Sequence, residues 1–363
     1  MQTTVKTLAA ALGFNECRIA RATTAHHAGR FHQWLAAGCH GDMAWLARNP
    51  QRRCDPREVL PGCQAVICLA LNYYNGSSSF PPHAAGGYRI ARYAWNDDYH
   101  DLIEPRLAEL DAALRKLGGV QRCYVDTGPV LERDFASAAG VGWNGKSTMQ
   151  IHRRLGTWWF LAEVLTTLEL PPDAPLGDHC GNCTRCISAC PTQAITAPRR
   201  LDARRCIAYL TIEHKGPIPG ELRRALGDRI YGCDDCLEAC PWNRFAQVSR
   251  ELTFQARAEL FAHRLRDFLA LDAAGFRHLF ARSPIARLKR PRFLRNVCVA
   301  LGNTGNAEDL PALRQAAADP DPLIAEHAAW AITQIEDAAQ QDASPEPAIG
   351  YGAGSNLGCQ RRC

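Results

Sequence analysis

The 363-residue chain has no hydrophobic run long enough to cross a membrane. None approaches the roughly 20 apolar residues that a spanning helix needs. The first residues, Met1–Phe14, contain neither the long apolar core nor the small-residue cleavage site of an export signal. A large excess of one charge is also missing, since the net charge is only +5. We therefore expect a soluble, cytoplasmic protein without disulfide bonds, because cytosolic thiols are kept reduced.

Cysteine, by contrast, is plentiful, and eight of the 17 cysteines lie between Cys180 and Cys240. Residues 180–191 read C-x2-C-x2-C-x3-C-P, and residues 233–241 repeat the end of this pattern with three cysteines. The first run is typical of bacterial ferredoxins, in which three closely spaced thiolates bind one [4Fe–4S] cluster and the fourth cysteine binds another. Zinc is the alternative, but zinc sites usually pair two C-x2-C knuckles and need no following proline.

Two clusters need eight ligands, and the two runs supply seven cysteines. Cys206 is the nearest candidate for the eighth. We assign one cluster to Cys180, Cys183, Cys186 and Cys240, and the other to Cys190, Cys206, Cys233 and Cys236.

The residues before the cysteine runs alternate between helical and strand patterns. Apolar residues recur along one side of Asp101–Leu117, as in an amphipathic helix, whereas Ala65–Leu71 is an apolar run of buried-strand length. This alternation predicts an α/β (α+β) domain over residues 1–170. Prolines at the start of the next segment indicate a linker, and a ferredoxin-like domain with two [4Fe–4S] clusters is expected over 171–250.

Residues 251–337 are predicted to be helical and to contain a short repeat. Pro291–Leu301 aligns with Pro322–Ile332 at an offset of 31 residues, a period typical of helical pairs of the HEAT type. The polar, glycine-rich residues 338–363 are predicted to be disordered.

A basic run precedes the repeat. Its six cations can form either a solvated helix face or a surface that binds nucleic-acid phosphates. They lie within 14 residues that contain no acid, and they are Arg282, Arg287, Lys289, Arg290, Arg292 and Arg295.

Residues 140–147 match two nucleotide-binding motifs, G-x-G-x-x-G and G-x-x-x-x-G-K-S. Both motifs require a strand before the glycine turn and a helix after it. Here the preceding segment, 130–139, favours a helix and the following segment is short, so neither nucleotide motif is favoured. The glycines instead suggest that the backbone approaches a bulky ligand, with Lys146, Ser147 and Thr148 available to it.

Two acids, Glu132 and Asp134, lie on the predicted helix before this turn. Residues two apart on a helix point to different sides, so at most one of them faces a given cavity. A carboxylic acid in an apolar pocket stays protonated near neutral pH and can act as a general acid. Asp134 precedes Phe135 and Ala136, which suits burial, although a position on the helix surface is the alternative.

Together these features resemble the epoxyqueuosine reductase family over roughly residues 5–335. The resemblance is carried by 55–57, 92–95, 98–100, 131–136, 140–148 and the cysteine set. It implies a cobalamin-dependent iron–sulfur enzyme that performs the last step of queuosine biosynthesis. Such an enzyme reduces the epoxide of epoxyqueuosine, at the wobble position of a tRNA, to the cyclopentene.

The resemblance also implies roles for individual residues. Asp134 would donate the proton to the epoxide oxygen, and residues 1–170 would bind cobalamin. The chain has no D-x-H-x-x-G sequence, so the implied cobalamin is base-off, with no histidine on the cobalt. The basic run and the helical repeats would hold the tRNA. The expected neighbours of the corrin are Arg57, Tyr99, His100, Asp134, Gly142, Lys146, Ser147 and Thr148.

We also expect an external electron donor of the flavodoxin or ferredoxin type, and we expect the protein to be a monomer. One alternative is another cobalamin and iron–sulfur reductase that acts on a small molecule, such as a reductive dehalogenase, but these normally carry a twin-arginine export signal. The other is a two-cluster electron carrier, which has no need of the long N-terminal half.

Overall fold

A four-stranded sheet forms the centre of the N-terminal half. The computed structural model describes residues 1–76 and 87–342. In the sheet order, the strands are β1 (Glu16–Arg21), β2 (Ala65–Asn72), β7 (Trp159–Thr166) and β4 (Gln121–Tyr124). Every neighbouring pair is antiparallel. The mixed helix and strand content predicted from the sequence is confirmed, and it takes the α+β form.

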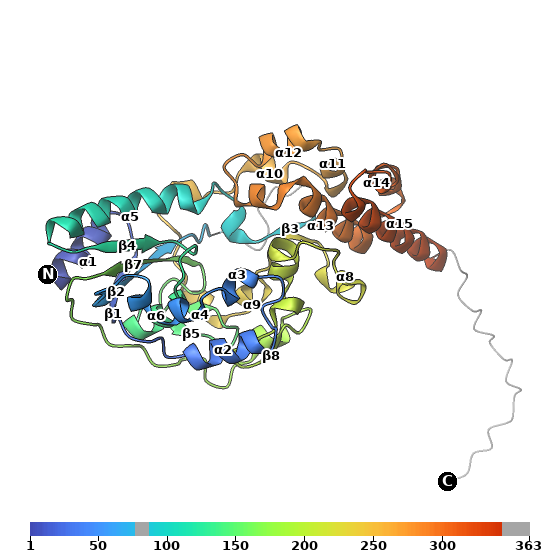
Figure 1. Cartoon of the computed structure of the whole chain (residues 1–363). Coiled ribbons are helices and arrows are strands. Elements are labelled where there is room, and N and C mark those ends of the chain that lie inside the picture. Colours follow the sequence, from blue (N-terminus) through green and yellow to red (C-terminus); the bar gives the residue numbers. More distant parts are fainter. Residues whose placement is uncertain (77–86, 343–363) are drawn as a thin grey trace, which may run out of the picture.

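Helices cover both faces of this sheet (Figure 1). Ile67 and Leu69 pack with α1 (Gln2–Ala11) and α5 (Tyr99–Lys116) in one core. The alternating residues Val66 and Cys68 face the other side and share a core with α6 (Glu132–Ala139). Because successive side chains of a strand point to opposite faces, β2 is buried along its whole length.

The links between these strands carry short elements. Helices α2 (Ala28–Ala36), α3 (Ala44–Ala47) and α4 (Pro50–Cys54) lie between β1 and β2 in the chain. A hairpin of β5 (Trp143–Asn144) and β6 (Gln150–Ile151) follows α6. The glycine turn is thus preceded by a helix and followed by a strand, the reverse of the nucleotide-binding motifs.

The glycines of this turn are explained by contacts within the chain itself. Gly140 ends α6 with a φ of +77°, in the left-handed region. A Cβ atom at Gly142 would lie 2.3 Å from the carbonyl oxygen of Ile151 on the facing strand. The backbone approach that we attributed to a ligand is therefore an approach between two segments of this chain.

The cysteine-rich region is built from short elements. They are α7 (Arg185–Ser188), β8 (Ile195–Ala197), β9 (Arg200–Leu201), α8 (Gly220–Leu226), β10 (Arg229–Tyr231) and α9 (Asp235–Glu238), with a π-helical turn at Tyr209–Glu213. Helices α7 and α9 contain Cys186 and Cys236 and pack against each other. Each cysteine run thus folds into one helical turn, and the two runs lie side by side.

The C-terminal part is helical. Its helices are α10 (Ala258–Phe261), α11 (Leu265–Leu269), α12 (Ala273–Leu279), α13 (Lys289–Thr304), α14 (Leu310–Ala317) and α15 (Pro322–Asp342). Helices α13 and α14 both pack against α15. The predicted tail began at residue 338, but α15 continues to Asp342, and residues 343–363 lie outside the described part of the chain. Within the described ranges, no helix is long and apolar enough to cross a membrane.

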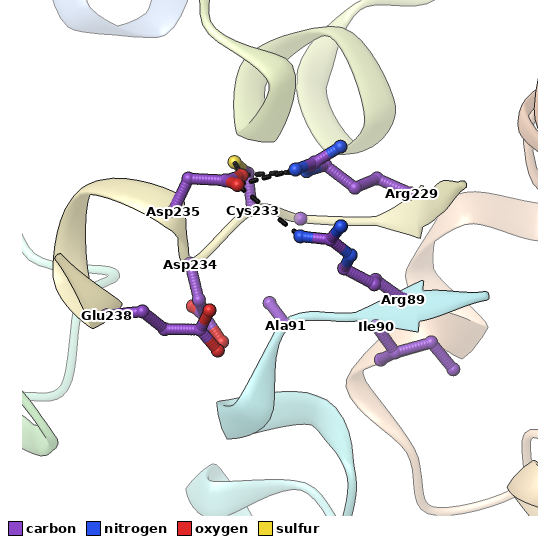
Figure 2. Close-up of a pocket in the computed structure, with 9 residues that line it drawn as sticks. Arg89, Ile90, Ala91, Arg229, Cys233, Asp234, Asp235 and Glu238 are labelled. Carbon is purple, nitrogen blue, oxygen red and sulfur yellow. Dashed lines mark hydrogen bonds and ion pairs between the residues drawn. The ribbon is translucent and has the colours of Figure 1, made fainter. Parts of the chain in front are cut away.

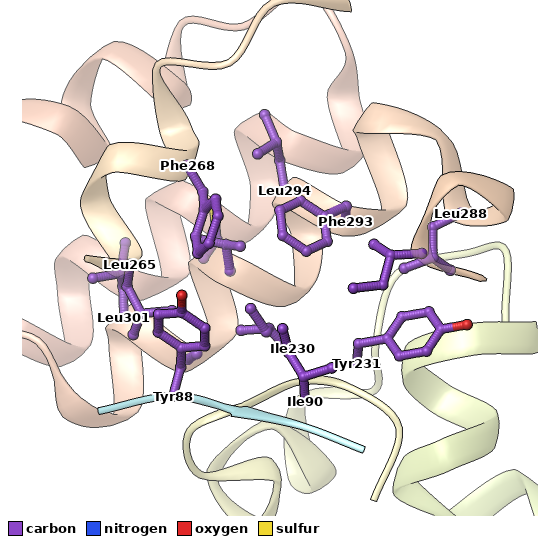
Figure 3. Packing of buried hydrophobic residues seen from close by; sticks show 14 of the residues in the cluster. Tyr88, Ile90, Ile230, Tyr231, Leu265, Phe268, Leu288, Phe293, Leu294 and Leu301 are labelled. Atoms are coloured by element: carbon purple, nitrogen blue, oxygen red, sulfur yellow. The ribbon is translucent and has the colours of Figure 1, made fainter. Parts of the chain in front are cut away.

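One N-terminal segment belongs to the C-terminal core. Strand β3 (Arg89–Ile90) pairs in parallel with β10. Tyr88 and Ile90 pack in the same buried cluster as Phe268 and Phe293 (Figure 3). The predicted division at residue 170 therefore does not separate two independent cores.

Candidate active site

The first cysteine set lines a single pocket. The four thiols come from the one-turn helix α7, the loop before it and the loop after α9. Four cysteine thiols around one pocket are the usual donor set of a [4Fe–4S] cluster. The lining residues are Cys180, Cys183, Cys186 and Cys240 together with Lys146, Ser147, Ile151, His179, Pro241 and Trp242.

The β5–β6 hairpin supplies the wall of this pocket. Lys146 donates a hydrogen bond from Nζ to the carbonyl oxygen of Gly181 at 2.6 Å, and Ser147 is buried. The indole N–H of Trp143 is buried without a hydrogen-bond acceptor among the described residues, and burial raises the pKa of the adjacent Cys180 thiol. Lys146 and Ser147, which we expected beside a corrin, line the first cysteine pocket. Gly142 lies at the base of the same hairpin.

Three members of the second set lie together. Burial and the charges of the neighbouring thiols Cys206 and Cys190 raise the pKa of Cys236. The thiol of Cys233 donates to Asp235, with Sγ 2.7 Å from Oδ2, and Cys233 packs against the same buried hydrophobic cluster as Cys206. Figure 2 shows this pair beside Arg89 and Arg229, which both form ion pairs with Asp235.

Helix α6 reaches toward the second set through Arg133. Burial lowers the pKa of Arg133, and the thiols Cys236 and Cys206 partly offset this effect. The side chain is nevertheless exposed to solvent. Its Nη1 donates to the carbonyl oxygen of Thr148 at 3.3 Å, so Arg133 links α6 to the turn between β5 and β6.

Asp134 lies on a different side of α6 and is only 8% exposed. Its Oδ2 accepts a hydrogen bond from the backbone N–H of His27 at 2.8 Å, and its Oδ1 contacts Nδ1 of the His27 imidazole ring. His27 is the residue at the N-terminal end of α2. The predicted burial of Asp134 is confirmed, but its carboxyl group is engaged by α2 and not held in an apolar pocket.

Glu132 has the environment that was expected for Asp134. Burial raises the pKa of Glu132 to about 7, and the charge of Asp126 acts in the same direction. Its Oε1 is buried and has no hydrogen-bond donor within the described part of the chain. Its neighbour is the carboxyl group of Glu163 on β7. Sequence reasoning missed Glu163, although a single charged residue in the apolar run 158–165 was a usable signal.

Tyr99 and His100 meet at Asp126, which lies in the loop after β4. The Tyr99 hydroxyl donates to Asp126, and His100 Nε2 lies 3.2 Å from its Oδ1. Burial disfavours the charged form of His100, but hydrogen bonds to Asp126 and Asp98 outweigh it and raise the pKa to about 9. Tyr99 and His100 therefore both contact Asp126. Arg57 is half-exposed and bound to Asp55.

The basic run divides into exposed and buried members. Arg295 is 0% exposed and donates to the carbonyl oxygens of Leu210, His214 and Gly216. The prediction that Arg295 contacts nucleic acid is wrong, because every bond it forms is internal.

Arg290 and Arg292 are also engaged within the protein. Arg290 pairs with Asp319 at 2.7 Å, and Arg292 donates to the carbonyl oxygen of Ile212 at 2.8 Å. Lys289 is exposed at the start of α13. Arg282 and Arg287 are exposed cations that form ion pairs with Asp97 and Asp98.

Comparison with known proteins identifies the family. Residues 179–243 match the 4Fe-4S double cluster binding domain, and residues 53–127 match the family described as epoxyqueuosine reductase QueG, DUF1730. The epoxyqueuosine reductase of Xanthomonas campestris is 44% identical over 91% of this chain and 95% of its own length. That of Escherichia coli K12 is 40% identical over 89% of this chain and 86% of its own length. The chain belongs to the epoxyqueuosine reductase family.

Solved epoxyqueuosine reductases have the same fold. One, crystallised with a tRNA-Tyr epoxyqueuosine-modified stem loop, is 30% identical and covers 94% of this chain and 91% of its own, with a TM-score of 0.86. The Streptococcus thermophilus reductase is 25% identical and covers 96% of this chain and 95% of its own, with a TM-score of 0.84. Epoxyqueuosine reductases are cobalamin and iron–sulfur enzymes, and the double-cluster match spans both cysteine runs of this chain.

Proposed function

We propose that this protein reduces epoxyqueuosine to queuosine at the wobble position of tRNA. The observation that carries the proposal is the likeness to a reductase crystallised with an epoxyqueuosine-modified tRNA stem loop, at a TM-score of 0.86 over 94% of this chain. Converting an epoxide to an alkene and water consumes two electrons and two protons. The protein therefore needs an electron path, a reducing centre, an acid and a surface for tRNA.

The electron path would consist of two [4Fe–4S] clusters. Cys180, Cys183, Cys186 and Cys240 already surround one pocket, which supports their binding of one cluster. Cys190, Cys206 and Cys236 are neighbours and would bind the other, with Cys233 turned away from Asp235. An external flavodoxin or ferredoxin would deliver electrons one at a time.

The region between α6 and the second cysteine set would hold the remaining cofactor, because the exposed guanidinium of Arg133 lies there within the influence of Cys206 and Cys236. Cobalamin, when bound, would supply the strongly reducing centre that opening an epoxide demands. Arg133 and the backbone at Thr148 would contact it. The base-off form is supported by the missing D-x-H-x-x-G sequence and by the engagement of His100 with Asp98 and Asp126.

Asp134 would be the proton donor. Its side chain is only 8% exposed on α6, and its carboxyl group contacts His27 at the start of α2. A carboxyl group that carries a proton can act as a general acid. Asp134 would protonate the epoxide oxygen as its bond to carbon breaks.

The tRNA surface would include the exposed cations Arg282, Arg287 and Lys289 at the start of the packed helices α13–α15, which we interpret as HEAT-like. Phosphate contacts would orient the anticodon loop, while the modified base is splayed from its stack into the site. Because tRNA is a cytoplasmic substrate, we place the enzyme there, and we propose that it acts as a monomer.

The proposal is tested by anaerobic turnover of tRNA that carries epoxyqueuosine. The cluster-reconstituted protein is supplied with a chemical reductant, with and without cobalamin, and the digested nucleosides are analysed by mass spectrometry. We expect cobalamin-dependent loss of one oxygen atom. No conversion by a protein with both clusters reduced and cobalamin bound would contradict the proposal.

A further inference from the structure

The two cysteine sets differ in how they meet the surface of the protein. The residues between the first three cysteines of the first set are exposed to solvent. In the second set, Cys206 and Cys233 pack against one buried hydrophobic cluster and Cys236 packs against another. An electron that enters from outside would therefore reach the first set before the second.

Cations lie around the pocket that the first set lines. Lys146 lines the pocket itself. Nη2 of Arg153 lies 2.9 Å from Nε2 of His179, which is another lining residue. Arg185 lies between Cys183 and Cys186 in the chain and is exposed.

Two further arginines extend this charge on either side. Arg199 donates from Nε to the carbonyl oxygen of Asn144 at 3.1 Å, at the start of the hairpin turn that contains Lys146. Arg244 is exposed and follows Cys240 by four residues. The five cations therefore come from the β5–β6 hairpin, the first cysteine run and the segments after each run.

The same surface carries little negative charge. Asp178 is the only acid in residues 174–201, and it pairs with Arg199 at 2.5 Å. A surface of one sign next to a redox site attracts a partner of the opposite sign and speeds its association.

Aromatic rings lie among these cations. Trp242 lines the pocket, and its ring centroid lies 5.4 Å from that of Phe245, which is 43% exposed. The guanidinium of Arg244 lies over the same Phe245 ring, 4.5 Å from its centroid. Aromatic side chains and arginines are enriched where proteins bind one another.

Resting on the proposed function, we propose that the five cations and the rings of Trp242 and Phe245 form an electron-entry surface that docks an acidic flavodoxin. Its acids would meet the cations, and the apolar edge of its flavin would meet the two rings. In each encounter the reduced flavin loses one electron, and the cluster that the first set would bind gains it. Two encounters supply the two electrons that the epoxide consumes.

The test uses the holoenzyme with both clusters reconstituted. The double variant Arg153→Glu with Arg244→Glu reverses two charges of the electron-entry surface, and Arg277→Glu on α12 reverses an exposed charge elsewhere as the matched control. Two readouts are taken at several salt concentrations. Calorimetry measures the binding of an acidic flavodoxin, and stopped-flow absorbance measures reduction of the clusters by flavodoxin hydroquinone or by dithionite.

We expect the double variant at low salt to bind flavodoxin at least about tenfold more weakly and to be reduced by it at least about tenfold more slowly. Reduction by dithionite, a small reductant that needs no docking surface, should be equal in all three proteins. The wild type and Arg277→Glu should lose affinity alike as salt rises, because salt screens the attraction.

Phe245→Ala tests the aromatic part of the surface separately. It should weaken flavodoxin binding about threefold and leave the salt dependence unchanged, because it removes a ring and no charge. A wild-type affinity in this variant would remove the rings from the surface.

Wild-type binding and reduction in the double variant would overturn the electron-entry surface, as would an equal loss with dithionite. A ferredoxin that reduces the wild type through these cations when flavodoxin does not would overturn flavodoxin as the partner. A wild-type enzyme that flavodoxin reduces but that converts no epoxyqueuosine would instead overturn the proposed function.

Discussion

Two sides of α6 carry carboxyl groups that differ in their hydrogen-bond partners. Asp134 accepts the N–H of His27, and its hydrogen bonds are satisfied by the fold. Glu132, two residues earlier, has a buried oxygen with no donor among the described residues and lies against a second acid. Two carboxyl groups on one helical turn therefore differ in their surroundings, and environment decides how each is protonated.

The largest expected effect separates the two acids by activity. Asp134→Asn should reduce turnover about 10²-fold or more, because asparagine has no carboxyl proton to donate to the epoxide oxygen. Glu132→Gln should retain most of the activity. Both variants should keep their clusters and cobalamin, as read from the visible spectrum after gel filtration. A dead Glu132→Gln beside an active Asp134→Asn would reverse the assignment.

The next effect concerns stability and pH. Burial raises the pKa of Glu132 from its ordinary 4.5 to about 7, so between these values the native state keeps a proton that the unfolded state has lost. Glu132 should therefore lower the free energy of unfolding by about 3 kcal/mol as pH rises through this window. Glu132→Gln should show a smaller fall than the wild type, because burial also raises the pKa of Glu163 and that contribution remains. Denaturant titrations at pH 4 and pH 8 would measure the difference. Glu169→Gln, a change at an exposed glutamate, is the control and should behave like the wild type.

A smaller loss is expected on the other side of the helix. Asp134→Ala leaves the N–H of His27 without its partner and should lower the free energy of unfolding by about 1–3 kcal/mol. Thermal unfolding followed by circular dichroism measures it. The comparison between the two acids would weaken if Asp134→Ala were as stable as the wild type.

The smallest effect extends the comparison to the basic run. Lys289→Ala removes one exposed cation, so tRNA binding should weaken modestly and the slope of log K against log salt should become shallower by about one. Arg290→Ala removes a cation that is paired with Asp319, and it should leave this slope unchanged. Filter binding at several salt concentrations tests both. Equal slopes in the two variants would show that exposure does not decide which cations contact the tRNA.

Much of this arrangement could be predicted from local patterns. The apolar run Ala65–Leu71 became β2, and the amphipathic stretch Asp101–Leu117 became α5 within two residues at each end. The four thiols that we assigned to the first cluster line one pocket, although Cys240 belongs to the second run.

What the sequence could not predict depended on which face of a helix is packed. Nothing local distinguishes the surroundings of Glu132 from those of Asp134, since these are set by β7 and α2, which are distant in the sequence. In the basic run, Arg295 is as charged as Lys289, yet α13 turns it inward. The periodicity of apolar residues predicted the helices. It did not predict which face of each helix is buried, because that depends on packing against segments distant in the sequence.

The buried guanidinium of Arg295 also bears on how the protein could be shortened. It joins α13 to the backbone of residues 210–216, directly after Cys206. Tyr88 and Ile90, from the first quarter of the chain, complete the core of the same helices. If the chain ended before α13, the three carbonyl groups would lose their hydrogen bonds to Arg295. Tyr88 and Ile90 would lose the buried side chains that they pack against. The C-terminal helices thus stabilise the cysteine-rich region, and a minimal reductase cannot be made by removing them.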